Sequence, residues 1–92
     1  MPVYLTAIVK VKPEFHNEMK AMLLALPVRS VKEEACIRYE VHQNVDDEDM
    51  FIFHELWENI EGLDKHNQQP YSQEFFASFE KLQEKPTVYI SK

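Results

Sequence analysis

The sequence predicts an α+β fold with elements in the order β-α-β-β-α-β, in which an antiparallel sheet carries helices on one face. Three observations lead to this fold. Apolar segments of strand length occur near both ends of the chain and in its middle, two segments with helical apolar spacing separate them, and an acidic stretch joins the two middle strands. The chain has 92 residues, so we expect one domain spanning residues 1–92.

The first third of the chain predicts a strand and a helix. Residues 3–11 alternate, are rich in β-branched side chains and are apolar on both faces, which is typical of a central strand. Pro13 begins a predicted helix with five apolar residues at helical spacing: Phe15, Met19, Met22, Leu23 and Leu26. We expect this helix to end at Pro27. Ser30 followed by Glu33 has the form of a capping box and predicts a further short helical turn.

The last third predicts a second helical region and a final strand. Asn59 is a suitable N-cap, and apolar residues follow it at helical spacing. Gln69-Pro70 interrupts the pattern, and Lys85-Pro86 ends it. Residues 87–91 then predict a short last strand, which completes the ferredoxin-like order of elements.

The middle of the chain predicts a β-hairpin. Two strands are expected at residues 36–44 and 50–58, joined through the acidic residues 46–49. Centring the turn on the acidic residues places Val41 opposite His54 in our expected register.

This register gives the hairpin two faces of different character. The face expected beneath the helices is mostly apolar and holds Ile37, Tyr39, Val41, Ile52, His54 and Leu56. The other face mixes charges with aromatic side chains and holds Arg38, Glu40, His42, Phe53, Glu55 and Trp57. We expect this second face to form a homodimer interface through Arg38, Glu40, Glu55 and Trp57. The alternative is a solvated face with surface ion pairs worth less than about 1 kcal/mol each.

The composition excludes some partners. The net charge is −6, which disfavours binding to a nucleic-acid backbone or to an anionic membrane surface. No apolar stretch reaches the length of a membrane span, and the N-terminus lacks the pattern of a signal peptide. The single cysteine, Cys36, permits no internal disulfide and suits a reducing compartment. We therefore expect a cytoplasmic protein.

No motif for a metal or a nucleotide is present. His42, His54 and His66 are isolated in the sequence, and the acidic residues 46–49 lack the glycine of a calcium loop. The chain has one glycine, so it has no glycine-rich loop for phosphates. Cys36 has no neighbouring partner that would indicate a nucleophile. We expect no metal and no cofactor.

Three segments resemble the antibiotic biosynthesis monooxygenase domain family. They are Glu34-Ala-Cys-Ile-Arg-Tyr-Glu-Val, Phe53-His-Glu-Leu-Trp-Glu-Asn and Leu63-Asp-Lys-His-Asn-Gln-Gln-Pro-Tyr. The resemblance covers essentially the whole chain and implies a dimeric α+β barrel, in which two sheets face each other and each subunit has a pocket between sheet and helices. The chain departs from the family pattern at Ala35, where a glycine is common, and at Tyr71, where a second histidine is common.

The resemblance also implies a function. Members of the family include cofactor-independent monooxygenases that oxidise phenolic or quinol-type aromatic substrates with molecular oxygen. Two alternatives stay open: an isomerase of a small carbonyl compound, and a non-catalytic ligand-binding or stress-response dimer. The haem-degrading branch of the family shows an Asn, a Trp and a haem-ligating His at the positions that match Thr6, His66 and Phe76. None of the three agrees, so haem is not expected.

The candidate catalytic residues are His66, Tyr71 and His54. An imidazole that titrates near neutrality suits proton abstraction from a phenol or an enolisable carbon, which makes His66 the expected general base; the alternative is a histidine of the helix surface or of the core. His54 is expected either to line a cavity or to be hydrogen-bonded in the core. Tyr71 would take the place of the family's second histidine. The expected substrate-contacting residues, with simple packing as the alternative, are Thr6, Tyr39 and Phe75.

Overall fold

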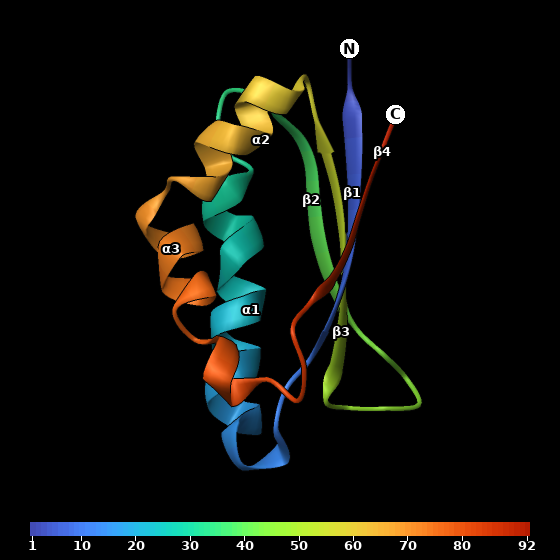
Figure 1. The fold of residues 1–92 in the computed structure, drawn as a ribbon, viewed down its shortest axis with the longest axis vertical. Coiled ribbons are helices and arrows are strands. Elements are labelled where there is room, and N and C mark those ends of the chain that lie inside the picture. The colour runs from blue at the N-terminus through green and yellow to red at the C-terminus, as the bar shows by residue number, and fades with distance from the viewer.

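One antiparallel sheet of four strands and one layer of helices make up the computed structural model, which describes all 92 residues (Figure 1). The elements in chain order are β1 (Val3–Lys10), the 3-10 turn η1 (Pro13–Phe15), α1 (His16–Ser30), β2 (Cys36–Gln43), β3 (Met50–Trp57), α2 (Ile60–Asn67), α3 (Pro70–Phe76), the 3-10 turn η2 (Phe79–Lys81) and β4 (Thr87–Ser91). The strand order is β2-β3-β1-β4. The predicted α+β order is confirmed, with the second helical region divided in two at Pro70.

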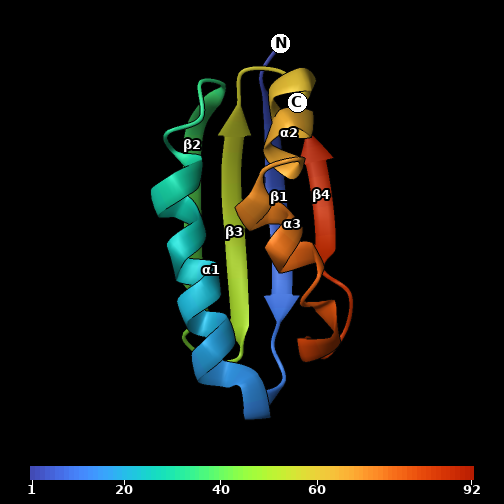
Figure 2. The same cartoon turned by 90° about the vertical axis from the view of Figure 1, so that its left-hand side faces the viewer.

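The helices cover only one face of the sheet. Figure 2 shows α1 on the side of β2, and α2 followed by α3 on the side of β1. Both chain ends lie at the same end of the molecule (Figure 1). None of the helices combines the length and the apolar character that a membrane crossing requires.

The sequence predicts that the first helix ends at Pro27, but α1 continues to Ser30. The Val31 N–H bonds to the Pro27 carbonyl over 3.1 Å, so the last turn closes beyond the proline. Met19, Leu23 and Leu26 of this helix are each at most 2% exposed, and this burial outweighs the cost of the interior proline. The predicted capping box is wrong as well, because Ser30 is the buried last residue of the helix.

The expected register of the hairpin is wrong by one residue. Tyr39 lies opposite Glu55 and Val41 opposite Phe53, and the pairing is irregular between Cys36 and Arg38. A shift of one residue exchanges the two faces of a strand. In the observed register β3 directs its large aromatic side chains toward the helices, and Phe51, Phe53 and Trp57 are each at most 3% exposed. Burying these rings removes much more apolar surface from water than the predicted register would.

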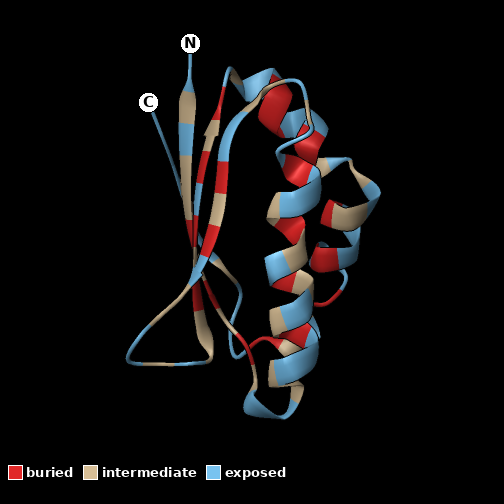
Figure 3. Ribbon diagram, turned by 180° about the vertical axis from the view of Figure 1, so that it is seen from behind, coloured by how far each residue is buried: buried red, intermediate tan, exposed pale blue.

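The core lies between the sheet and the helices (Figure 3). In that view the buried segments of the strands and of the helices face one another. Both the sheet side and the helix side contribute to the core, which has 14 apolar residues: Ala7, Val9, Val11, Met19, Leu23, Leu26, Tyr39, Val41, Phe51, Phe53, Trp57, Leu63, Phe75 and Leu82. This cluster leaves the opposite side of the sheet without a covering layer.

That uncovered side, called the open face below, is continuous across all four strands. The pairing of the strands places on it Tyr4, Thr6, Ile8, Arg38, Glu40, His42, Ile52, His54, Leu56 and Tyr89. Strand β4 is the least protected strand, since all five of its residues are exposed.

The start of α2 depends on a close approach of two backbone segments. Asn59 caps the helix as predicted, because its side-chain oxygen accepts a hydrogen bond of 2.8 Å from the Gly62 N–H. A Cβ atom added to Gly62 would overlap the Cβ of Ala35. The only glycine of the chain therefore stands where α2 packs against the segment that leads into β2. No residue of the chain has a positive φ, so Ala35 makes no left-handed turn.

We expect Gly62→Ala to lower the free energy of unfolding by about 1–3 kcal/mol, although alanine is the better helix former, because the new methyl group meets Ala35. The double variant Gly62→Ala/Ala35→Gly should recover most of the loss, since it removes the opposing methyl group. Urea unfolding followed by circular dichroism measures both. A Gly62→Ala protein as stable as the parent would contradict this account.

Candidate functional site

A cavity of about 240 Å³ lies between the sheet and the α2–α3 segment, in the place where the family resemblance implies a pocket. A dry apolar cavity of about 150 Å³ is enough to hold benzene, so this one has room for a substituted or two-ring compound. Its wall is mostly apolar and includes Leu5, Ala7, Val9, Leu26, Tyr39, Phe53, Phe75, Phe76, Phe79 and Val88. The polar side chains in the wall are few: Glu55, His66, Asn67, Ser72 and Lys85. This combination is typical of small-molecule sites.

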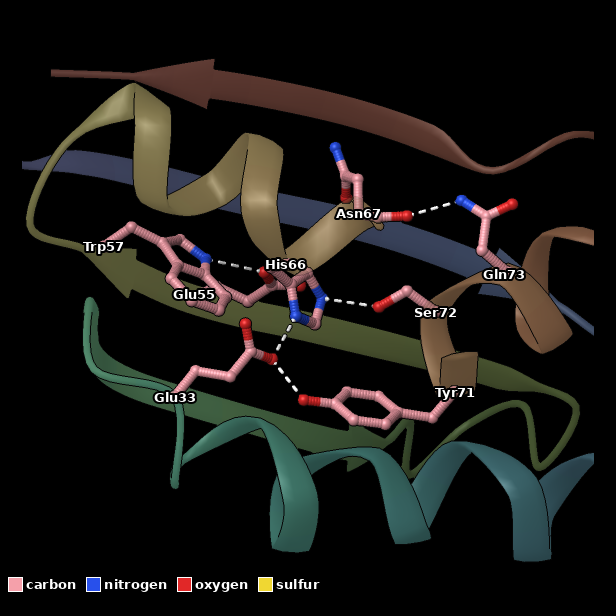
Figure 4. Close-up of polar contacts among 8 residues, drawn as sticks. All are labelled: Glu33, Glu55, Trp57, His66, Asn67, Tyr71, Ser72 and Gln73. Atoms are coloured by element: carbon pink, nitrogen blue, oxygen red, sulfur yellow. Dashed lines mark hydrogen bonds and ion pairs between the residues drawn. The ribbon is translucent and has the colours of Figure 1, made fainter. Parts of the chain in front are cut away.

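His66 is held in place from both sides of its ring (Figure 4). It lies in the last turn of α2 and is 6% exposed. Its Nδ1 atom lies 2.7 Å from Oε2 of Glu33, and its Nε2 atom lies 3.4 Å from the Ser72 hydroxyl oxygen. Because a carboxylate oxygen accepts hydrogen bonds, Nδ1 carries the proton and the lone pair of the neutral ring is on Nε2.

Glu33 also accepts a hydrogen bond from Tyr71. The Tyr71 hydroxyl donates to the same Oε2 atom over 2.5 Å, and the guanidinium carbon of Arg29 lies 5.2 Å from the centre of the tyrosine ring. Burial and the Glu33 carboxylate raise the pKa of Tyr71 above its ordinary value. Tyr71 is therefore a neutral hydrogen-bond donor at physiological pH, and it is not among the residues that line the cavity.

Glu55 is a buried carboxyl group in the cavity wall. It lies on β3 with 6% exposure and accepts a hydrogen bond of 2.9 Å from the indole N–H of Trp57. Burial raises its pKa from 4.5 to about 7, although the hydrogen bond from Trp57 opposes the rise. A carboxyl group with this pKa is present in both protonation states near neutrality, so it can either donate or accept a hydrogen bond.

Aromatic rings surround the imidazole. The ring centre of His66 lies 4.7 Å from that of Trp57 and 5.4 Å from that of Tyr39. Tyr39 in turn makes T-shaped contacts with Phe53 and Trp57. Burial and the Glu55 charge raise the pKa of the Tyr39 hydroxyl. The acid–base groups of the cavity therefore lie in a largely apolar setting, where electrostatic interactions are stronger than in water.

Three of the six predicted catalytic and substrate-contacting residues line the cavity, and three, including Tyr71, do not. His66, Tyr39 and Phe75 line it. Thr6 and His54 pair with each other across β1 and β3 on the open face, so their expected place in the cavity is wrong. The one-residue shift in register is the reason for His54, and Thr6 alternates with the inward-facing Leu5 and Ala7.

The four residues expected at the dimer interface also lie on two different faces of the sheet. Arg38 and Glu40 lie on the open face, where the Arg38 Nε atom is 3.3 Å from a Glu40 oxygen. Glu40 also bonds His42 over 2.9 Å, and this contact lowers the pKa of the Glu40 carboxyl. Glu55 and Trp57 are buried beneath the helices, so their predicted position on that interface is wrong.

Sequence reasoning missed two acidic residues of the site. Glu55 could have been found by requiring that Phe53 and Trp57 point inward, since alternate residues of a strand share a face. Glu33 had no such signal, because it lies 33 residues from His66 in the chain and meets it only through the packing of α2.

Two other possible chemistries find no support in the geometry. No three His, Cys, Asp or Glu side chains are grouped so that they could hold a metal ion. Burial raises the pKa of Cys36 to about 11, so its thiol is protonated at neutral pH and is a poor nucleophile.

The fold and the cavity define a class of small α+β proteins in which a sheet covered on one face encloses an apolar pocket with a few acid–base groups. The chain belongs to the antibiotic biosynthesis monooxygenase family, whose model matches residues 2–78. The family resemblance found in the sequence is thereby confirmed.

Relatives of known sequence and structure agree with this membership. The chain is 33% identical over 85 residues to Uncharacterized protein sll1783 of Synechocystis, a match that covers 92% of this chain and 58% of that protein. The chain thus spans little more than half the length of that relative. It is 30% identical to Putative monooxygenase YcnE of Bacillus subtilis, covering 91% of this chain and 88% of that protein.

Solved structures share the fold. The structure of Rv0793 from Mycobacterium tuberculosis matches 100% of this chain and 94% of its own chain with a TM-score of 0.93 at 22% identity. A conserved protein from Methanosarcina mazei matches 100% of this chain and 92% of its own chain with a TM-score of 0.89 at 27% identity.

The raised pKa of Glu55 predicts a dependence of stability on pH. The folded protein keeps a proton that the unfolded chain releases between pH 4.5 and about 7, so the contribution of Glu55 to stability falls as the pH rises through this window, by on the order of 3 kcal/mol, and is constant above it. Glu55→Gln should remove this slope, which urea unfolding at about pH 5 and about pH 8 measures.

The matched control is Glu61→Gln, which removes an exposed carboxyl group from α2 and should keep the slope of the parent. A parent and a Glu55→Gln variant that lose stability equally over the window would show that Glu55 does not titrate in this range.

Proposed function

We propose that the protein is a cofactor-independent monooxygenase that oxidises a small phenol or quinol in the cavity. The observation that carries the proposal is the apolar cavity of about 240 Å³ with His66 and Glu55 in its wall. Membership of the monooxygenase family supports the reaction type. The aromatic lining supports the substrate class, because aromatic rings bind well between aromatic and aliphatic side chains.

The reaction begins when Nε2 of His66 takes the proton from a substrate hydroxyl group. The electron-rich ring carbon of the phenolate then forms a bond to molecular oxygen. The O–O bond breaks as water leaves, and the carbon that has lost its hydrogen becomes a carbonyl. The substrate loses four electrons and oxygen gains four, so one phenol and one O₂ give one quinone and one water.

The surrounding residues support this chemistry. The apolar wall excludes water from the anion, which strengthens its interactions with the few polar groups present. Glu55 has a pKa of about 7 and can hydrogen-bond a second oxygen of the substrate in either protonation state. The Ser72 hydroxyl lies beside Nε2 of His66, where the transferred proton arrives.

Oxygen uptake by metal-free protein tests the proposal. With a panel of one-ring and two-ring phenols and quinols, we expect uptake of one O₂ per quinone formed. His66→Ala should lower kcat by about 100-fold or more, because the general base is lost. His16→Ala, which removes a histidine at the start of α1, away from both the cavity and the open face, should leave kcat unchanged. Uptake with no member of the panel, together with no effect of His66→Ala, would exclude the proposed reaction.

A proton-shifting isomerase of a small carbonyl compound is the second candidate. The observation that favours it is the presence of two acid–base groups, Glu55 and His66, in one cavity, since an isomerase removes a proton at one atom and returns one at another. Solvent deuterium that appears in the substrate without oxygen would support the isomerase over the monooxygenase. Binding without turnover under either condition would support a ligand-binding protein.

The proposed functional unit is a homodimer formed through the open face. Tyr4 and Tyr89 are exposed on that face, and Ile8, Ile52 and Leu56 are half-buried there. A chain of this size buries a small share of its surface alone, so covering this face with a second copy stabilises both. The charged residues beside the apolar ones are typical of an interface rim.

Light scattering at micromolar concentration tests the dimer. We expect twice the chain mass of 11.0 kDa. Ile52→Arg places a charge in the middle of the open face and should give a folded monomer, whereas Val28→Arg, at an exposed position of α1, should stay dimeric. A parent protein that is monomeric at this concentration would rule out the interface.

A further inference from the structure

We infer that Glu33 is the positioning residue of the site: it fixes the tautomer of His66 and stabilises the imidazolium that forms when the ring takes a proton. This inference rests on the proposed function, because it assigns His66 the role of general base. It adds a residue that lies outside the cavity wall and acts only through His66.

The first argument is the geometry of the Glu33–His66 pair. The separation of 2.7 Å between Nδ1 and Oε2 is that of a charge-assisted hydrogen bond. The side chains are only 7% and 12% exposed, so water competes little for this contact. A proton held on Nδ1 leaves Nε2 as the basic atom, and Nε2 is the atom beside Ser72 in the cavity wall (Figure 4).

The second argument is the arrangement around the Glu33 carboxylate. Tyr71 donates its hydroxyl proton to the oxygen that accepts from His66, so two donors from α2 and α3 fix one carboxylate oxygen. An oxygen held by two donors has a defined direction, and this direction sets the plane of the imidazole ring. The sequence predicted Tyr71 to be catalytic, but in this arrangement it acts on the substrate only through Glu33 and His66.

The third argument is the position of Glu33 relative to the cavity. Glu33 borders a separate surface hollow, together with Glu34 and Lys65, and is not part of the cavity wall. Its carboxylate therefore reaches a substrate in the cavity only through His66.

The reaction step needs no proton transfer to Glu33. The substrate O–H bond breaks, its proton forms the N–H bond at Nε2, and the electron pair stays on the substrate oxygen. The imidazolium then carries protons on both nitrogens and is paired with the Glu33 carboxylate. The Nε2 proton and the hydrogen of the oxygenated ring carbon leave with the outer peroxide oxygen as water, and the loss of the Nε2 proton restores the starting tautomer for the next turnover.

Nitrogen chemical shifts of the histidine ring test the tautomer without any substrate. In isotope-labelled protein at mildly alkaline pH, we expect the His66 signals of a protonated Nδ1 and an unprotonated Nε2. Glu33→Gln should alter the balance of tautomers, whereas Glu34→Gln, a neighbouring exposed residue of the same hollow, should not. A protonated Nε2 in the parent protein would overturn the inference, even if no substrate is ever found.

The second readout is the kinetics of a substrate that the protein oxidises. Glu33→Gln should lower kcat by about 100-fold or more with little change in KM, as expected when a tautomer-fixing carboxylate is lost. Glu33→Asp keeps the charge and should recover part of the rate. Tyr71→Phe keeps the carboxylate and should cost less than Glu33→Gln, and Glu34→Gln should keep the parent rate.

These measurements separate the inference from the proposed function. A large loss in His66→Ala together with no loss in Glu33→Gln would keep the general base and reject the role of Glu33. If Glu33→Gln fails to fold, the tautomer of the parent protein and the rate of Glu33→Asp still test the role of Glu33. A protonated Nε2 in the parent would reject this role. A fully active Glu33→Asp variant whose carboxylate no longer contacts His66 would reject it as well.

Discussion

The pairing of β3 with its two neighbours determines what the cavity contains. Alternate residues of a strand face opposite sides, so a register that buries Phe53 and Trp57 must also bury Glu55 between them. The carboxyl group pays for this with desolvation, and the indole N–H of Trp57 offsets part of that cost. The same pairing places His54 and Leu56 on the open face. One choice of register thus supplies both an ionisable group for the cavity and apolar side chains for the open face.

The site also depends on a close packing of two segments that are distant in sequence. Gly62 lies one helical turn before His66, and Ala35 lies two residues after Glu33. The contact of Gly62 with Ala35 therefore sets the separation between the imidazole and the carboxylate. Asn59 fixes the start of the same helix, so its direction is defined at the end nearest this contact. The small residues at 35 and 62 act on the chemistry through geometry, without any polar contact of their own.

The sequence was sufficient for the order of elements, the cap at Asn59 and the positions of Tyr39, His66 and Phe75. These features depend on local periodicity and on single-residue chemistry. It was insufficient for the register of the hairpin, because the irregular pairing near Cys36 and the exchange of faces follow from three-dimensional packing. It was also insufficient for Pro27, where tertiary burial outweighed a local preference. The Glu33–His66 contact spans 33 residues, and no periodic pattern encodes such a pair.

The exposure of β4 has a consequence for local stability. All five of its residues are exposed, yet Val88 and the neighbouring Lys85 and Pro86 form part of the cavity wall. Stability varies within a fold, and a strand with little buried surface opens at a lower free energy than a core strand. The cavity therefore has one wall built from β1 and β3, and one wall beside β4, the strand that we expect to open at the lowest free energy.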